Sequence, residues 1–60
     1  MATYRIFKFE AKEGRVLGPP IVVASDTDEQ PVAQAQQLID GAVVEVWQGK
    51  RLVQRFQPKS

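Results

Sequence analysis

Few side chains in this sequence are able to do chemistry. The chain has no histidine and no cysteine, the two residue types that dominate zinc and transition-metal sites, and histidine is also the usual general base. Its two serines, Ser25 and Ser60, therefore lack the partner that activates a nucleophile. Hydrolase triads are excluded, and we expect no enzymatic activity, no catalytic residue, no metal site and no cofactor.

Asp26, Asp28 and Glu29 form the only cluster of carboxylates. Such a cluster could hold a hard cation or supply a carboxylate pair. The spacing of a calcium-binding loop is absent, however, and acidic residues are favourable at the start of a helix, where they cap N–H groups and complement the helix dipole. We therefore interpret the cluster as the beginning of a helix.

The only tryptophan stands close in sequence to three basic side chains. The stretch VVEVWQGKRLVQRF, residues 43–56, contains Trp47 with Lys50, Arg51 and Arg55. An exposed ring beside arginines is able to stack on a nucleic-acid base while the guanidinium groups hold phosphates. The same residue types are also enriched in protein interfaces, and arginine stems cover a tryptophan in many ordinary sheets. All three interpretations stay open at this point.

Glycine and proline mark turns in this sequence. The four glycines stand singly and form no phosphate-binding or dinucleotide fingerprint, so each indicates a turn or a helix end. The Gly-Pro-Pro segment at 18–20 lacks the PxxP spacing of a proline-recognition ligand. Because proline donates no hydrogen bond to a β-ladder, we predict a bulge, a bend or an outer edge there.

The length of the chain allows one domain, residues 1–60, with a frayed tail at 57–60. A domain of this size buries only about 60% of the surface that its unfolded chain exposes. It has no cysteine to form a disulfide, so additional stability must come from packing or from self-association.

Charge is distributed unevenly, although the net charge is only +1. Residues 1–24 carry a net +2, residues 25–41 carry −4 and residues 42–60 carry +3. The overall balance predicts no polyanion partner. The N-terminal stretch has no apolar core of signal-peptide length, and no apolar run is long enough to cross a bilayer. We expect a cytoplasmic protein with no membrane partner.

The segment TYRIFKFEA, residues 3–11, alternates in the way that is typical of a strand. One of its faces carries Arg5, Phe7, Phe9 and Ala11, and the other carries Tyr4, Ile6, Lys8 and Glu10. Because the two phenylalanines are the stronger apolar pair, we predict that they face the core and that Tyr4 lies on the outer side. A turn at Gly14 and a second strand over residues 15–25 complete a first hairpin.

The one helical stretch lies between residues 25 and 41. Its apolar positions recur at spacings of three and four and form one narrow stripe, namely Val32, Ala35, Leu38 and Ile39. Several polar residues before it are candidate N-caps, and Gly41 fits a C-terminal stop. We predict a helix from about Asp28 to Ile39, in which Pro31 is tolerated only within the first turn.

The register of the last hairpin decides which side chains share a face with Trp47. A two-residue Gln-Gly turn would place Leu52 opposite Glu45 and mix the faces. A shift of one residue, through a three-residue loop or a bulge, places Leu52 opposite Val46 and gathers the apolar residues, including Ala42, Val44 and Phe56. The other face then carries Val43, Glu45, Trp47, Arg51, Val53 and Arg55.

These elements predict an α+β fold, a single ββαββ domain in which one helix packs on one face of a four-stranded, mainly antiparallel sheet. One helix shields one side of the sheet only. The other side is therefore wet or covered by another subunit. Our candidate interaction face on that side consists of Tyr4, Trp47, Arg51, Val53 and Arg55.

Four stretches of the chain resemble a group of short bacterial proteins of unknown function. They are TYRIF, GRVLGPP, ASDTDEQ and VEVWQGKRLVQRF, and the resemblance covers essentially the whole length. It implies a bacterial, free-standing ββαββ domain and supplies no activity, ligand or catalytic residue. Pro31 departs from the group, whose members more often carry an ordinary helix former there, and this bears on where the helix begins.

For function, we predict a small, non-enzymatic protein-interaction module that self-associates through the open sheet face. The predicted partner is a second copy, which gives a homodimer, or another protein. The reasons are the unshielded face and the small core. The alternative is a single-stranded nucleic-acid-binding module that uses Trp47, Arg51 and Arg55, with Tyr4 as a second stacking platform. The low net charge and the missing aromatic RNA-binding motif speak against it.

Overall fold

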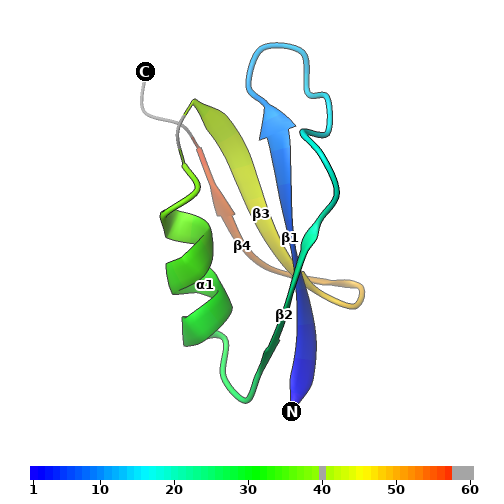
Figure 1. Ribbon diagram of the computed structural model, residues 1–60, viewed down its shortest axis with the longest axis vertical. Coiled ribbons are helices and arrows are strands. Elements are labelled where there is room, and N and C mark those ends of the chain that lie inside the picture. The colour runs from blue at the N-terminus through cyan, green and yellow to red at the C-terminus, as the bar shows by residue number, and fades with distance from the viewer. Residues whose placement is uncertain (40, 58–60) are drawn as a thin grey trace.

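The computed structural model describes residues 1–39 and 41–57. Two strands, β1 (Ala2–Glu10) and β2 (Ile21–Ser25), are followed by the helix α1 (Glu29–Gln36) and then by β3 (Ala42–Gln48) and β4 (Arg51–Phe56) (Figure 1). The strands form one antiparallel sheet in the order β2-β1-β3-β4. The predicted ββαββ fold is confirmed. Of the predicted tail at 57–60, residues 58–60 lie outside the described residues.

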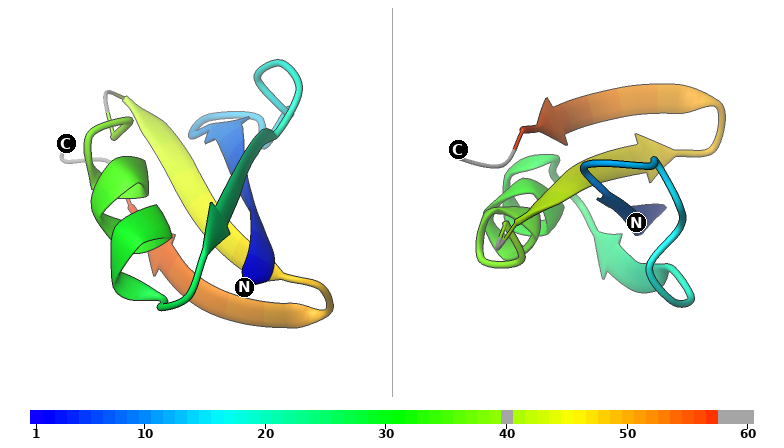
Figure 2. Two further views of the ribbon diagram at one scale, coloured as in Figure 1. Left: turned by 60° about the horizontal axis from the view of Figure 1, so that its bottom comes forward. Right: turned by 90° about the horizontal axis from the view of Figure 1, so that it is seen from above.

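The helix packs against one side of a strongly twisted sheet and touches all four strands (Figure 2). The core lies between the two, and its centre is a cluster of buried side chains from α1, β1 and β3: Tyr4, Ile6, Ala35, Val44 and Val46. Residues at the rim pack around this cluster, among them Val23, Leu38 and Phe56. The small side chain of Ala35 is fully buried, which allows the helix to approach the sheet closely.

The predicted facing of β1 is wrong. Tyr4 and Ile6 are buried on the helix side, and Phe7 and Phe9 are only half-buried on the other side. Both faces of this strand carry two large apolar residues, so alternation alone did not decide between them. Pairing decides it, because β1 is locked to β3 with Ile6 opposite Val46, and a strand pair keeps opposed residues on one face.

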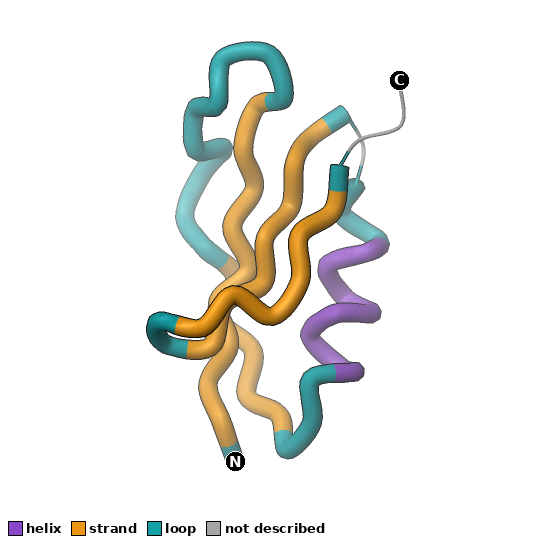
Figure 3. The backbone as a smooth tube through the Cα atoms, turned by 180° about the vertical axis from the view of Figure 1, so that it is seen from behind, coloured by secondary structure: helices purple, strands orange, loops and turns teal. Residues whose placement is uncertain are grey.

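Strand β2 is shorter than predicted. Regular pairing with β1 covers only residues 21–25, and a single isolated bridge joins Phe9 to Val16 on the other side of the Gly-Pro-Pro segment. Residues 11–20 form an exposed loop that projects beyond the sheet (Figure 3). The prolines therefore interrupt an edge strand, in agreement with the sequence prediction, since β2 is at the outside of the sheet.

Helix α1 begins at Glu29, and Pro31 is its third residue, within the first turn as the sequence requires. The ring of Pro31 is also buried, which the sequence pattern did not indicate. The helix ends three residues earlier than predicted, because the N–H groups of Gln37 and Leu38 bond to the carbonyls of Gln34 and Ala35 in a tightened last turn. Leu38 nevertheless packs against the core from beyond the helix.

The β3–β4 hairpin has a tighter turn than predicted. Gln48 pairs with Arg51, which leaves Gly49 and Lys50 as a two-residue loop, and Gly49 has the positive φ of 60° that such a turn requires. A β-bulge follows, so that Trp47 is opposite Leu52 and Val46 is opposite Gln54.

The extra residue in this bulge is Val53, and it reverses the facing of the start of β4 relative to our expectation. Val53 packs against the core, and Arg51 contacts Asp28 beside the helix start. Leu52, predicted to be inside, lies on the open side opposite Trp47. The predicted placement of Val44 and Phe56 on the core side is confirmed, and the two residues are direct partners.

In the part of the chain that the structure describes, no helix is long and apolar enough to cross a membrane.

Candidate functional site: the open face of the sheet

The open face is the side of the sheet away from α1. Apart from the pair of Thr3 and Ala24 at one end, its residues form three rows that run across the strands. The first row spans all four strands as Val22, Arg5, Trp47 and Leu52. The second row is Phe7, Glu45 and Arg55, and the third is Val16, Phe9 and Val43. Among the described residues, the interrupted β2 contributes no residue to the second row, so Phe7 has no paired residue on its outer side.

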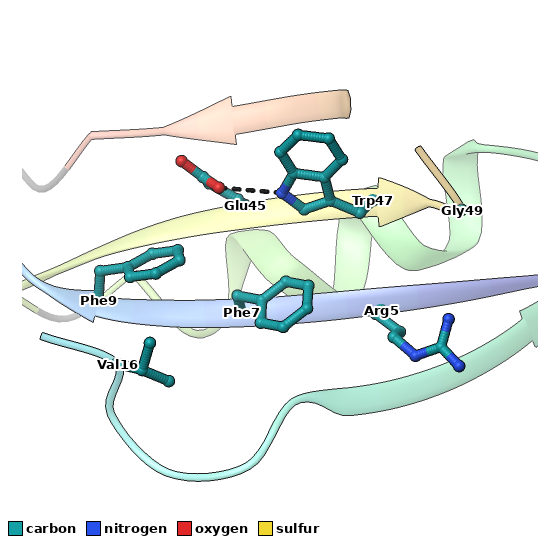
Figure 4. A pocket seen from close by; sticks show the side chains of 7 residues that line it. All are labelled: Arg5, Phe7, Phe9, Val16, Glu45, Trp47 and Gly49. Carbon is teal, nitrogen blue, oxygen red and sulfur yellow. Dashed lines mark hydrogen bonds between the residues drawn. The ribbon is translucent and has the colours of Figure 1, made fainter. Parts of the chain in front are cut away.

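Aromatic rings line the middle of the open face (Figure 4). The rings of Phe7 and Phe9 are stacked along β1, with centroids 6.3 Å apart and an angle of 26° between their planes. Across the strand pair, the indole of Trp47 faces the same space from β3. This alignment follows from strand alternation, which brings every second residue of β1 and β3 to one face.

A groove of about 390 Å³ lies between these rings. Its lining is mainly apolar and comes from β1, β3 and the two adjoining turns: Arg5, Phe7, Phe9, Val16, Glu45, Trp47 and Gly49. A smaller hollow of about 230 Å³ adjoins it, and the two share Phe9 and Glu45 as walls. The groove has the size and the composition of a small-molecule or side-chain binding site.

Two of the charges on the open face neutralise each other. Glu45 accepts a hydrogen bond from the indole Nε1–H of Trp47 at 2.9 Å, and Arg55 Nε lies 3.2 Å from the other carboxylate oxygen. Both oxygens of Glu45 are therefore occupied, and its side chain is largely buried, with 19% exposed. This pair fixes the orientation of Trp47 and leaves the wall of the groove without a free carboxylate.

A second polar cluster lies on the helix side, where the sequence analysis did not place it. The hydroxyl of Tyr4 donates to Asp28 Oδ1 at 2.5 Å, and Arg51 donates to the same carboxylate at 3.1 Å and also to Gln48. The hydrogen bond from Tyr4, followed by that from Arg51, lowers the pKa of Asp28. The hydrogen bond to Asp28, together with burial, raises the pKa of Tyr4.

Asp28 thus has a different role from the predicted one. It occupies the position before the first helical residue, but its side chain makes no capping hydrogen bond and instead ties the helix start to β1 and β4. Asp26 pairs with the N-terminal ammonium group at 3.4 Å. Among residues 1–39 and 41–57, no three metal-ligating side chains gather in one place.

The structure divides the predicted interaction face between the two sides of the sheet. Trp47 and Arg55 lie on the open face as expected, whereas Tyr4, Arg51 and Val53 lie on the helix side. The open face also carries four residues that we had predicted for the core side: Arg5, Phe7, Phe9 and Leu52. The facing of β3 was predicted correctly. With the pairing register of β1 and β3 it would also have given the facing of β1, because paired residues lie on the same face of a sheet.

Comparisons of the chain with family models, with curated proteins and with solved structures find no match. The resemblance to short bacterial proteins therefore stays a prediction.

Proposed function

We propose that the protein is a small, non-enzymatic interaction module that binds a second copy of itself through the open face. The observation that supports this most strongly is the aromatic groove of Phe7, Phe9 and Trp47 on the side of the sheet that the helix does not cover. Interface centres are enriched in aromatic residues and arginine, and this face carries both.

Exposed apolar side chains at both edges of the open face extend the groove. Leu52 on β4 is 44% exposed and Val22 on β2 is 60% exposed, and both stand in the same row as Trp47. A second open face would cover these side chains together with the half-buried rings. Each Å² of apolar surface removed from water contributes about 25 cal/mol, so such an interface adds stability that a small core supplies only sparingly.

Sedimentation of two matched variants tests this proposal. Leu52 and Leu17 are similarly exposed, at 44% and 41%, but only Leu52 belongs to the rows of the open face. We expect the wild type and Leu17→Gln to sediment as two chains at high micromolar concentration, and Leu52→Gln to dissociate at concentrations at least about tenfold higher, because its amide would be buried without a partner. A wild-type mass of one chain at high micromolar concentration would end the proposal.

The fluorescence of Trp47 gives an independent reading, since the chain has one tryptophan. If a second copy covers the open face, the emission maximum is blue-shifted at high concentration and moves to the red on dilution. A maximum that stays red at all concentrations indicates an uncovered ring and contradicts the proposal. A maximum that stays blue is assigned by the sedimentation mass, because it arises either from a tight dimer or from the half-buried setting of the ring in a monomer.

The second candidate function is single-stranded nucleic-acid binding. It is favoured by the three aromatic rings on the two central strands, which are available for base stacking. It is weakened by the arginines, because Arg51 is bonded to Asp28 on the other side of the sheet and Arg55 is paired with Glu45. Titration with a single-stranded oligonucleotide at low and moderate salt decides it, and the absence of salt-sensitive binding excludes this function.

A further inference from the structure

The arginines of the chain differ in what they contact. Arg15 pairs with Glu13 at 3.1 Å, Arg51 with Asp28 at 3.1 Å and Arg55 with Glu45 at 3.2 Å. For Arg5 the structure gives no ion pair and no side-chain hydrogen bond with any other residue among 1–39 and 41–57. Its partners in the sheet are Val22 and Trp47, neither of which offers a carboxylate.

Arg5 also has a particular place relative to the groove. Along β1, Arg5 precedes Phe7 and Phe9 on the open face, and it lines one end of the groove. It is also the residue of β1 directly opposite Trp47 (Figure 4). At the same end, Gly49 contributes a wall without a side chain, and a Cβ added there would meet no atom within 4 Å. The guanidinium therefore stands at an open end of an apolar groove.

The other charge in the wall does not compete for this guanidinium. Glu45 is held by Trp47 and Arg55, as described above, so its carboxylate oxygens already have partners. The groove thus offers an aromatic middle and, at its end, one cation without a carboxylate partner in the part of the chain that the structure describes. A fitting ligand carries the complementary pair of features, a ring and one negative charge.

We propose that the groove binds a small aromatic carboxylate, with the ring between Phe7 and Trp47 and the carboxylate on Arg5. A guanidinium accepts a carboxylate in a two-pronged geometry, and aromatic rings pack favourably against one another. The volume of about 390 Å³ is in the lower part of the range of small-molecule sites, which suits a ligand of one or two rings. One guanidinium matches a single carboxylate better than a phosphate, which carries up to two negative charges at neutral pH.

This inference does not rest on self-association, but the two use the same surface. A ligand in the groove and a second copy on the open face exclude each other, so ligand binding is expected to favour the single chain. The ligand experiment is therefore run at a dilution at which the protein sediments as one chain, and in parallel on Leu52→Gln, since Leu52 does not line the groove.

The probe is 3-phenylpropionate, and its uncharged counterpart is 3-phenylpropionamide. Titration of each is followed by the emission of Trp47 and by the amide and indole resonances of the protein. We expect saturable shifts centred on Phe7 and Trp47 with the carboxylate, and binding at least about tenfold weaker with the amide, because the charged hydrogen bonds to Arg5 are lost.

The matched variants are Arg5→Gln and Arg15→Gln. The first removes the guanidinium from the groove, and the second removes an exposed arginine from the loop, which does not line the groove. We expect Arg5→Gln to weaken carboxylate binding at least about tenfold and to leave amide binding unchanged, with Arg15→Gln equal to wild type. Equal affinity for the two probes, an unaffected Arg5→Gln variant, or no saturable shift would overturn the inference, whatever the oligomeric state of the protein.

Discussion

On the helix side of β1, Tyr4 and Ile6 are enclosed by the core, whereas on the open side of the same strand Phe7 and Phe9 keep part of their rings exposed. Both pairs are large and apolar, and they come from adjacent positions in one strand. Their different burial arises from what lies over each face, since the described residues form one helix for a sheet with two sides.

The polar groups of the two sides also differ, in whether they have bonding partners within the fold. On the helix side, Tyr4, Asp28 and Arg51 bond to one another, so that an acid, a base and a phenol are all satisfied within the fold. On the open side, Glu45 and Arg55 pair with each other, whereas Arg5 has no carboxylate partner among residues 1–39 and 41–57. The helix side is thus an internal contact of the domain, and the open side has the surplus of apolar surface and charge that a binding surface needs.

The largest expected effect is on the free energy of unfolding, and it differs between the apolar residues of the two sides of the sheet. Ile6→Ala removes a fully buried side chain and is expected to cost about 2–5 kcal/mol of the free energy of unfolding. Phe7→Ala removes a larger side chain from a half-buried position and is expected to cost less than half as much when the protein is dilute. Urea unfolding of both variants at low micromolar concentration measures this, and equal losses would show that the open face is also part of the core of the monomer.

The polar cluster on the helix side predicts a pH dependence. The pKa of Asp28 is lowered in the folded protein, so its contribution to stability is present above the pKa of an unfolded aspartate, about 3.9, and is lost as the pH falls through the folded value. The pKa of Tyr4 is raised, so its contribution is present below about 10 and is lost as the pH rises through the folded value.

Thermal unfolding across the acidic range tests the first half of this prediction. We expect Asp28→Asn to have a lower Tm than wild type at neutral pH, with a smaller effect than Ile6→Ala, and the two curves to converge in acid. Asp26→Asn is the control, because that carboxylate is exposed and pairs only with the N-terminus among the described residues. A constant difference between wild type and Asp28→Asn down to the most acidic pH contradicts the linkage.

A substitution at the hairpin turn affects both sides at once, because Gly49 precedes the bulge that sets the facing of β4. Gly49→Ala places a side chain at a φ of 60° without any clash, and the strain of that backbone conformation is expected to cost about 1 kcal/mol. Gly49→Asn is the matched variant and is expected to cost about as much, because Lys50 does not share the positive φ, and a two-residue turn of this kind takes glycine at its first central position. Urea unfolding compares the two, and a much smaller loss for Gly49→Asn would indicate a different turn.

The smallest expected effect concerns the ion pair on the open face. Glu45→Gln keeps an oxygen that accepts from Trp47 but removes the charge that holds Arg55, and we expect a loss of about 0.2–1 kcal/mol. High salt should reduce the difference between this variant and wild type. A larger, salt-independent loss would mean that Glu45 supports the packing of the sheet in a way that the ion pair does not explain.

The order of elements was predictable from the sequence because each has a local signal. The residues from 25 to 29 indicate a helix start, the prolines at 19 and 20 indicate an interrupted edge, and alternation indicates strands. The facing of β3 was also predictable, because Ala42, Val44 and Val46 form an unbroken apolar set on one side, whereas Glu45 interrupts the other side. Each of these signals involves only a few neighbouring residues, so a single sequence is enough to recognise it.

The composition of the open face was less predictable because it depends on register. Phe7 and Tyr4 exchange sides according to how β1 pairs with β3, and this pairing joins residues about 40 positions apart. The side on which Arg51 and Leu52 lie depends on a bulge that no residue type near Val53 announces. Trp47 and Arg55 were placed correctly because they lie on the parts of the hairpin where the predicted and observed facings agree.

The two outer strands have a consequence for how copies of this protein can add to one another. Beyond the five residues of β2, Pro19 and Pro20 offer no N–H, and β4 is bent by its bulge. Short, proline-flanked and bulged edges are poor templates for strand-by-strand addition, which is the route to fibrils. Contact through a face, by contrast, closes when two copies meet about a twofold axis. Strand-by-strand growth from these edges is therefore disfavoured, and assembly through a face is expected to stop at two copies.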